Sequence, residues 1–532
     1  MRNSSSFRSL ALARRHGFVD RTLVIAVGSL VVLAFLIYAL VAFKPQFGPA
    51  GTQPITGKKT QPLVIYCAAS NKSVIEAIRA DYEREFQVPL EIQYGPSQTL
   101  LASLAVTKTG DLYLPADDSY LKTARERDLI DDEYPLAQMQ AVVAVAKGNP
   151  QQIKSWQTLL KPEIRIAQAN PEAAAIGKMV KASLSERDLW DALHEGTTVY
   201  KTTVNDVAND VKTGSVDAGI VFDAVLHDYD SLEAVSIPEL EPVQAKVAIG
   251  VLQNSTQQRQ ARHFARYAAA SDKGLKHYSN HGFQPVAGEP WTEVPELILY
   301  SGSMLRPAIE KTITEFEERE GVRVTRVYNG CGILVAQMKA GQVPDAYFAC
   351  DVEFMNQVKD IFPVHETISQ NELVILVKKG NPAGVRNLKD LAKEGLRVGI
   401  GHEKQCAMGW LTQRTFNEGG VQEAVMKNVV VQTPTGDMLV NQMRSGSLDA
   451  AVVYLSNAAG SAHELDAIRI QGLQCSVAKQ PFGISKKTPH VQLAQRLLAA
   501  IRAKSSQSRF ELEGFLWADS QAKKVEKAVQ DE

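Results

Sequence analysis

An internal duplication constrains the fold of this chain more than any other feature. Residues 63–117 match residues 297–351 without a gap, and a second matching block follows in the same order in both copies. In that block GSVDAGIVF (Gly214–Phe222) corresponds to GSLDAAVVY (Gly446–Tyr454). The period of about 230 residues is too long for a solenoid repeat, so it indicates two copies of a whole domain.

Within each copy, short apolar segments alternate with segments of helical periodicity. This alternation is typical of an α/β fold with a mostly parallel sheet that is covered on both faces. The segments predicted as strands in the first copy are Leu63–Tyr66, Leu90–Tyr94, Asp111–Leu114, Ala141–Ala146, Ile164–Ala167 and Ala218–Phe222. Such sheets bind ligands at the carboxyl ends of their strands, where Ser70, Ser97, Asn170 and Phe222 are expected.

The overall composition excludes several classes of function. The 58 Lys and Arg residues are balanced by 59 Asp and Glu residues, which argues against a nucleic acid or an acidic polymer as partner. The chain has no Ser-His-Asp order, HExxH motif, P-loop or nucleotide-binding fingerprint. The sequence therefore predicts a protein that is not an enzyme, has no catalytic residues and binds a small molecule or another protein.

The N-terminal region contains a candidate membrane anchor. Residues 22–43 carry no charge and would span about 33 Å as a helix, enough for the core of a bilayer. Five arginines precede this segment and only Lys44 follows it closely, which predicts a cytoplasmic N-terminus and an exported remainder. A cleaved signal peptide is the alternative, although its apolar region is normally shorter.

These observations divide the chain into six parts. Both binding domains are expected outside the cytoplasm, in the periplasm, held by a single membrane-spanning helix. The predicted parts are a cytoplasmic N-terminus (1–21), a transmembrane anchor (22–43), a linker rich in Pro and Gly (44–61), a first solute-binding domain (62–291), a second (292–520) and a tail (521–532).

The motifs of both copies resemble the periplasmic molybdate-binding proteins of ABC importers, within the type II solute-binding class. The first copy carries CAAS (Cys67–Ser70), YGPSQTL (Tyr94–Leu100), DLYLPAD (Asp111–Asp117), NPEAAAIG (Asn170–Gly177) and VKTGSVDAGIVF (Val211–Phe222). The second carries YSGSML (Tyr300–Leu305), YNGCGIL (Tyr328–Leu334), PDAYFACD (Pro344–Asp351) and MRSGSLDAAVVY (Met443–Tyr454).

This resemblance implies two lobes per domain, joined by two hinge strands, with a tetrahedral oxyanion held between them. It also implies capture of molybdate, tungstate or a similar small inorganic oxyanion for an ABC transporter permease, without a cofactor or a metal. Hydroxyls and the N–H groups at helix N-termini suit such an anion. The implied contacts are Ser70, Ser97, Ala175, Ile176, Val204 and Phe222 in the first domain, and Ser303, Cys331, Ala407, Met408, Gly436 and Tyr454 in the second.

Both copies depart from the pattern of the molybdate-binding proteins. Phe222 replaces a tyrosine in the first domain, and Cys331 replaces the second serine in the other. Ser303 is the best candidate for the opening serine of the second domain, although the ungapped repeat places it opposite Ala69. These departures leave open an alternative function, a membrane-tethered sensor or protein-interaction module with degenerate clefts.

Three cysteines, Cys331, Cys350 and Cys406, are expected at strand or loop ends that face the cleft of the second domain. Free cysteines are usually buried small residues. A disulfide between two of them, or a soft metal bound by their thiolates, is the alternative.

Overall fold

The computed structural model describes residues 61–518. The predicted anchor at residues 22–43 lies outside the described residues. Within residues 61–518, none of the helices combines the length and the apolar character that a membrane crossing requires.

The first domain runs from β1 to β10 and alternates strands with helices. Its strands are β1 (Leu63–Ala68), β2 (Leu90–Gly95), β3 (Leu112–Leu114), β4 (Ile130–Ala146), β5 (Ile166–Ala169), β6 (Thr197–Lys201), β7 (Ala218–Phe222), β8 (Leu232–Val235), β9 (Gln244–Leu252) and β10 (Gln284–Pro285). Its helices are η1 (Ala69–Asn71), α2 (Lys72–Phe86), α3 (Ser97–Thr107), α4 (Ser119–Glu126), α5 (Trp156–Leu159), α6 (Ala175–Ser185), α7 (Trp190–Gly196), α8 (Val204–Lys212), η2 (Asp223–Asp228), η3 (Pro238–Leu240), α9 (Gln258–Ala268) and α10 (Gly274–Asn280).

The second domain runs from β11 to β20. Its strands are β11 (Glu296–Gly302), β12 (Arg323–Asn329), β13 (Ala346–Phe348), β14 (His365–Lys378), β15 (Val398–Gly401), β16 (Val429–Thr433), β17 (Ala450–Tyr454), β18 (Leu465–Arg469), β19 (Val477–Ile484) and β20 (Leu516–Trp517). Its helices are η4 (Ser303–Leu305), α11 (Arg306–Glu320), α12 (Cys331–Lys339), α13 (Val352–Asn356), η5 (Leu388–Ala392), α14 (Ala407–Glu418), α15 (Gln422–Met426), α16 (Gly436–Arg444), α17 (Leu455–Ala459), η6 (Gln474–Ser476), α18 (Val491–Arg502) and α19 (Lys504–Leu512).

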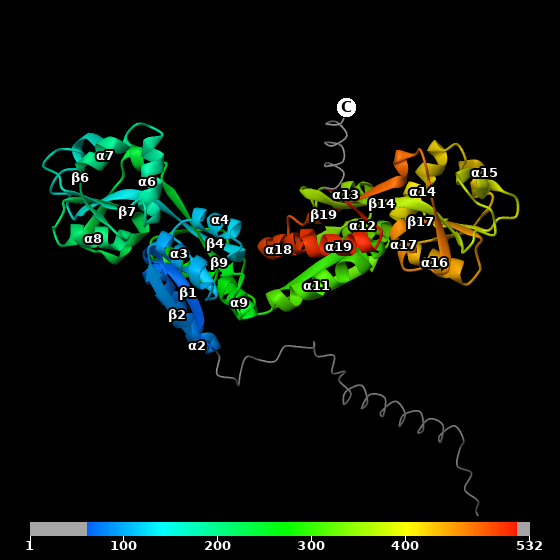
Figure 1. Cartoon of the computed structure of the whole chain (residues 1–532), viewed down its shortest axis with the longest axis horizontal. Coiled ribbons are helices and arrows are strands. Elements are labelled where there is room, and N and C mark those ends of the chain that lie inside the picture. The colour runs from blue at the N-terminus through cyan, green and yellow to red at the C-terminus, as the bar shows by residue number, and fades with distance from the viewer. Residues whose placement is uncertain (1–60, 519–532) are drawn as a thin grey trace, which may run out of the picture. The chain divides into compact units, whose positions relative to one another are not determined.

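Each domain consists of two lobes. In the first domain, β1, β2, β3, β9 and the start of β4 form the sheet of the first lobe, and the end of β4 with β5–β8 forms that of the second. Figure 1 shows the two lobes of the first domain, with α6, α7 and α8 around the sheet of the second lobe. The long strand β4 therefore passes from one lobe to the other, and the chain returns between β8 and β9.

The second domain repeats this topology strand for strand. The order β2-β1-β3-β9-β4-β7-β5-β6 of the first sheet corresponds to β12-β11-β13-β19-β14-β17-β15-β16 in the second. Equivalent side chains make equivalent contacts, since Arg165 pairs with Asp217 at 2.8 Å and Arg397 pairs with Asp449 at 2.8 Å. The structure thus confirms the duplication predicted from the sequence.

The expectation of a mostly parallel sheet was wrong in part. Strands β1, β2 and β3 pair in parallel, as do β5, β6 and β7, but β4 pairs antiparallel with β7, β8 and β9. The strand predicted at Ala141–Ala146 in fact begins at Ile130. The prediction missed its first half because charged and polar residues such as Asp131 and Gln138 occupy it. Hydropathy alone does not mark such a strand.

Candidate functional site: the two interlobe cavities

A cavity of about 20 Å³ lies between the lobes of the first domain. Loops that follow β1 and β2 provide one wall, and the starts of α6 and α8 with the end of β7 provide the other. All six residues predicted for this domain line it, namely Ser70, Ser97, Ala175, Ile176, Val204 and Phe222. The topology therefore brings the predicted contacts together, and their role in binding stays a prediction.

Three helices begin at this cavity. Helix α3 starts at Ser97, α6 at Ala175 and α8 at Val204, and all three residues are buried. The residues that precede α3 and α6 are Pro96 and Ala174, neither of which caps its helix with a side chain. The first N–H groups of a helix have no partner within it and carry a partial positive charge, so such N-termini suit an anion.

Two serines supply hydroxyls to the same cavity. Oγ of Ser70 is buried and has no hydrogen-bond partner among residues 61–518. Oγ of Ser97 accepts a hydrogen bond from the backbone N–H of Ala116 at 3.1 Å, which leaves its own hydroxyl proton free to be donated. A buried polar atom without a partner is costly, so the Ser70 hydroxyl indicates a place for a bound acceptor.

Of the described residues that line the first cavity, none carries a charge. Phe222, which is 1% exposed, closes one side with an apolar ring. The cavity thus offers neutral donors and helix dipoles to a ligand. This combination can hold an anion while still permitting its release.

The cavity of the second domain has the same size, about 20 Å³. Four of the six predicted residues line it, namely Ser303, Met408, Gly436 and Tyr454. Cys331 and Ala407 are fully buried beside it and are absent from its lining. Cys331 begins α12 and Ala407 begins α14, so both positions can still offer backbone N–H groups to a ligand.

The Tyr454 side chain brings a hydroxyl that the first domain lacks. The side chain is 2% exposed, and its hydroxyl has no hydrogen-bond partner in the described part of the chain. Burial raises the pKa of this hydroxyl well above its ordinary value, so it stays protonated and can donate. Phe222 occupies the equivalent position at the end of β7.

Met304 and Asn457, which the sequence prediction left out, also line the second cavity. Cys350 and Cys406, which were expected to face the cleft but were not among the implied contacts, line it as well. Strand β1 ends at Ala68 and β11 ends at Gly302, so Met304 is the equivalent of Ser70. Ser303 lines the cavity from the position of Ala69. The ungapped repeat already placed Ser303 opposite Ala69, whereas the family resemblance favoured Ser303 as the opening serine.

The cysteines of the second cavity differ in their surroundings. Sγ of Cys331 lies 2.6 Å from Sγ of Cys350 and accepts the backbone N–H of Cys350 at 3.1 Å. Burial raises the pKa of the Cys331 thiol, but these hydrogen bonds outweigh it and leave that pKa below its ordinary value. Among the described residues, no cluster of three or more His, Cys, Asp or Glu side chains has the arrangement of a metal site.

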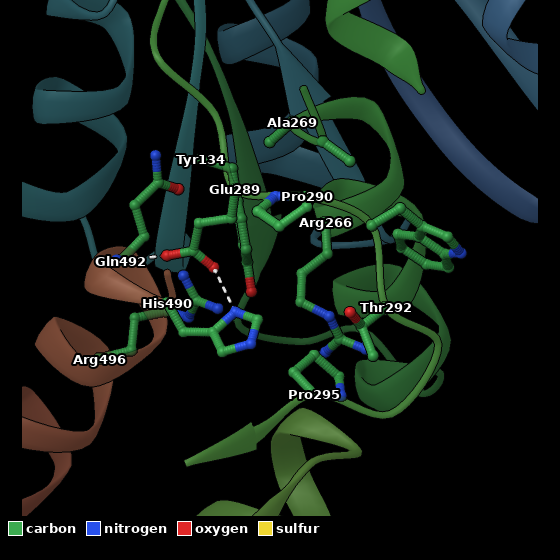
Figure 2. Close-up of a pocket in the computed structure, with 12 residues that line it drawn as sticks. Tyr134, Arg266, Ala269, Glu289, Pro290, Thr292, Pro295, His490, Gln492 and Arg496 are labelled. Atoms are coloured by element: carbon green, nitrogen blue, oxygen red, sulfur yellow. Dashed lines mark hydrogen bonds and ion pairs between the residues drawn. The ribbon is translucent and has the colours of Figure 1, made fainter. Parts of the chain in front are cut away.

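A further pocket lies away from both cavities (Figure 2). It is lined by residues of both domains, including Tyr134, Arg266 and Glu289 of the first and Arg496 of the second. Arg496 lies 3.2 Å from the buried carboxylate of Glu320, and Arg266 donates to the backbone carbonyl of the same residue. These contacts pack side chains of the first domain against side chains of the second.

Comparison with known proteins follows the same division into two domains. A family model described as a bacterial extracellular solute-binding protein matches residues 63–284 and again residues 297–516. A Bacillus subtilis protein named as an ABC transporter substrate-binding lipoprotein is 28% identical over 260 residues, which are 47% of this chain and 97% of that protein. A molybdate-binding protein of Mycobacterium bovis is 24% identical over 241 residues, 44% of this chain and 90% of that protein.

Among solved structures, the periplasmic molybdate-binding protein of Azotobacter vinelandii is 16% identical, with a TM-score of 0.37. The match covers 42% of this chain and 98% of that one. The matching family model describes solute binding, in agreement with the prediction that the protein is not an enzyme. The chain belongs to the bacterial extracellular solute-binding protein family and carries two copies of its domain in tandem.

Proposed function

We propose that each domain captures a small tetrahedral oxyanion of the molybdate and tungstate class between its lobes, for delivery to an ABC importer in the membrane. The observation that carries this proposal is the unpartnered, buried hydroxyl in each cavity, Ser70 in the first and Tyr454 in the second. Each hydroxyl lies beside helix N-termini, where an anionic acceptor is stabilised.

The lining of the first cavity favours an anion over a cation or a sugar. Cations such as Ca²⁺ and Mg²⁺ bind through carboxylates and carbonyl oxygens, and no carboxylate lines this cavity. Its volume of about 20 Å³ favours a small ligand. Neutral donors and two uncapped helix starts, α3 and α6, match the demands of a desolvated oxyanion.

The relatives support the same class of ligand and the same partner. One is named as a molybdate-binding protein and another as a substrate-binding lipoprotein of an ABC transporter. In this proposal residues 22–43 hold the two domains at the outer face of the membrane. The permease of the importer would then receive the anion from a tethered carrier.

The two sites are proposed to be unequal. The first has two serine hydroxyls and an apolar ring at Phe222, whereas the second has a ring hydroxyl at Tyr454 and thioethers at Met304 and Met408. Ser303, Thr435 and Asn457 also line the second cavity and can donate hydrogen bonds, whereas its thioethers are only weak acceptors. We therefore propose that the two sites differ in their preference among oxyanions.

The experiment is a thermal unfolding series on the purified full-length protein, with molybdate, tungstate, sulfate, phosphate and chloride at matched ionic strength. A specific anion at 100 times its dissociation constant stabilises its domain by about 2.7 kcal/mol. Molybdate or tungstate should raise the unfolding temperature of the first domain, with chloride as the control. If no oxyanion stabilises either domain, the alternative of a tethered interaction module with degenerate clefts replaces this proposal.

A further inference from the structure

Three equivalent positions change together between the two clefts. The first cleft has Ala68, Ser97 and Ala116 where the second has Gly302, Cys331 and Cys350. The backbone is the same at this point, because the N–H of residue 116 donates to Oγ of Ser97 and the N–H of residue 350 donates to Sγ of Cys331, each at 3.1 Å. The second cleft thus exchanges a hydroxyl and a methyl group for two thiols.

Gly302 makes the room that the second thiol needs. A Cβ atom at this position would lie 2.0 Å from Sγ of Cys350 and 3.1 Å from Sγ of Cys331. The φ angle of Gly302 is −59°, which any residue can adopt, so the glycine is required by space. In the first domain Ala68 stands at this position, opposite the small side chain of Ala116.

We propose that Cys331 and Cys350 form a thiol–disulfide exchange site within the cleft of the second domain. Their sulfur atoms lie 2.6 Å apart, and both side chains are buried on adjoining elements, the first residue of α12 and the loop after β13. The partner of this site is a disulfide oxidant, either a small molecule or an exported protein. Disulfides form and persist in oxidising compartments outside the cytoplasm.

The exchange balances without any other reactant. Cys350 lines the cavity and therefore meets the oxidant first, and its raised pKa makes this attack the slow step. It gives up its proton as it attacks one sulfur of the oxidant, which releases one thiolate. Sγ of Cys331 then displaces the second thiolate from this mixed disulfide. The Cys331–Cys350 bond forms, the disulfide of the oxidant breaks, and its two sulfurs take up the two electrons and the two protons.

The surroundings suit Cys331 as the group that completes the exchange. Its thiol is the one whose pKa is lowered by hydrogen bonds from Cys350, whereas hydrogen bonding to Cys331 and burial raise the pKa of Cys350. Cys331 also begins a helix of nine residues whose preceding residue, Gly330, gives no side-chain cap. A helix N-terminus and donated hydrogen bonds both favour a thiolate.

Oxidation would change the second cleft alone, a consequence that rests on the proposed oxyanion function. The disulfide has no S–H proton to donate and draws the Cys350 sulfur toward Cys331. Ser97 and Ala116 leave the first cleft insensitive to the same oxidant. The chain would then carry one redox-independent site and one that responds to the thiol state of its compartment.

The test is to count thiols in the full-length protein after treatment with reduced or oxidised glutathione, followed by denaturation and alkylation. The chain has five cysteines, so the reduced protein should give five alkylated thiols. After oxidation two should be lost, with a peptide linked through Cys331 and Cys350. This readout needs no ligand, so its failure is distinct from failure of oxyanion binding.

Two variants supply the controls, each made with the residue that the first domain already carries. Cys350→Ala and Cys331→Ser should each keep all of their remaining thiols under the same oxidant. Oxidised protein that keeps five free thiols would overturn the proposal. So would a linkage through Cys406, or a glutathione adduct on Cys350 that does not proceed to the intrachain disulfide.

Discussion

Ser97 accepts a hydrogen bond of 3.1 Å from the backbone N–H of Ala116, and this bond ties the first turn of α3 to the loop that follows β3. Both residues line the interlobe cavity of the first domain. The bond fixes the orientation of the serine oxygen and leaves its proton for a ligand. In the second domain the equivalent N–H, that of Cys350, donates to Sγ of Cys331. The same backbone arrangement therefore holds a hydroxyl in one domain and a thiol in the other.

Replacing Ser97 with alanine should weaken oxyanion binding by the first domain. A hydrogen bond to a charged partner contributes about 1.5–3 kcal/mol, which corresponds to roughly 10- to 150-fold in affinity. Isothermal titration calorimetry with molybdate measures this loss. Ser103→Ala, in the same helix but outside the cavity lining, is the matched control and should bind as the wild type does.

Replacing Tyr454 with phenylalanine should have opposite effects on stability and on binding. The buried hydroxyl has no partner in the free protein, so its removal should stabilise the ligand-free second domain by about 1 kcal/mol. The same change removes a donor from the cavity and should weaken oxyanion binding there. Urea unfolding and calorimetry on one preparation test both signs, and a loss of stability without a loss of affinity would contradict this role.

Replacing Gly302 with alanine should destabilise the second domain by about 1–3 kcal/mol, the usual cost of excess volume in a packed site. The added Cβ would meet Sγ of Cys350 at 2.0 Å. The double variant with Cys350→Ala restores the pair of alanines found in the first domain and should recover most of the stability. Gly460→Ala is the control, because a Cβ there meets nothing within 4 Å.

The carboxyl of Asp351 should make the second domain less stable as the pH rises. Burial raises its pKa to about 6, above the value of about 3.9 in an unfolded chain. Well below pH 4 the carboxyl is protonated in both states, and as the pH rises past 4 toward 6 mainly the unfolded state loses its proton. The cost grows to about 3 kcal/mol over this interval.

The Asp351→Asn variant should not show this loss. Its stability relative to the wild type should therefore increase between pH 4 and pH 6.5, as measured by urea unfolding at each pH. Asp117→Asn is the equivalent substitution in the first domain and controls for the general effect on the fold. A difference between wild type and Asp351→Asn that stays constant across this range would show that the carboxyl is not perturbed by burial.

The repeat could be predicted from self-alignment of the sequence, and the residues around the first cavity could be predicted because they lie in short motifs at strand ends and helix starts. Ser97 was expected at the end of a predicted strand, and the family resemblance implied Ala175 and Val204; all three residues begin helices. Strand β7 agrees with its predicted bounds. The sequence could not predict the direction of β4, because its first half mixes charged, polar and apolar residues and pairs with a segment more than a hundred residues away.

The second cavity was harder to predict because its lining depends on which way each side chain points. Cys331 and Ala407 occupy the positions implied by the resemblance, yet both pack beneath the cavity surface. Cys350 and Cys406 reach that surface from loops that no motif marked as binding residues. The self-alignment placed the three cysteines near the cleft, but only the structure shows which of them line the cavity and which pack beneath its surface.

The most direct test of the central claim is calorimetric titration of the reduced full-length protein with molybdate, alongside Ser97→Ala and Tyr454→Phe. The account predicts binding by the wild type, with each variant losing affinity at one site and keeping the other. Absence of binding by the wild type to molybdate and tungstate, or affinities unchanged by both substitutions, would contradict an oxyanion held between the lobes.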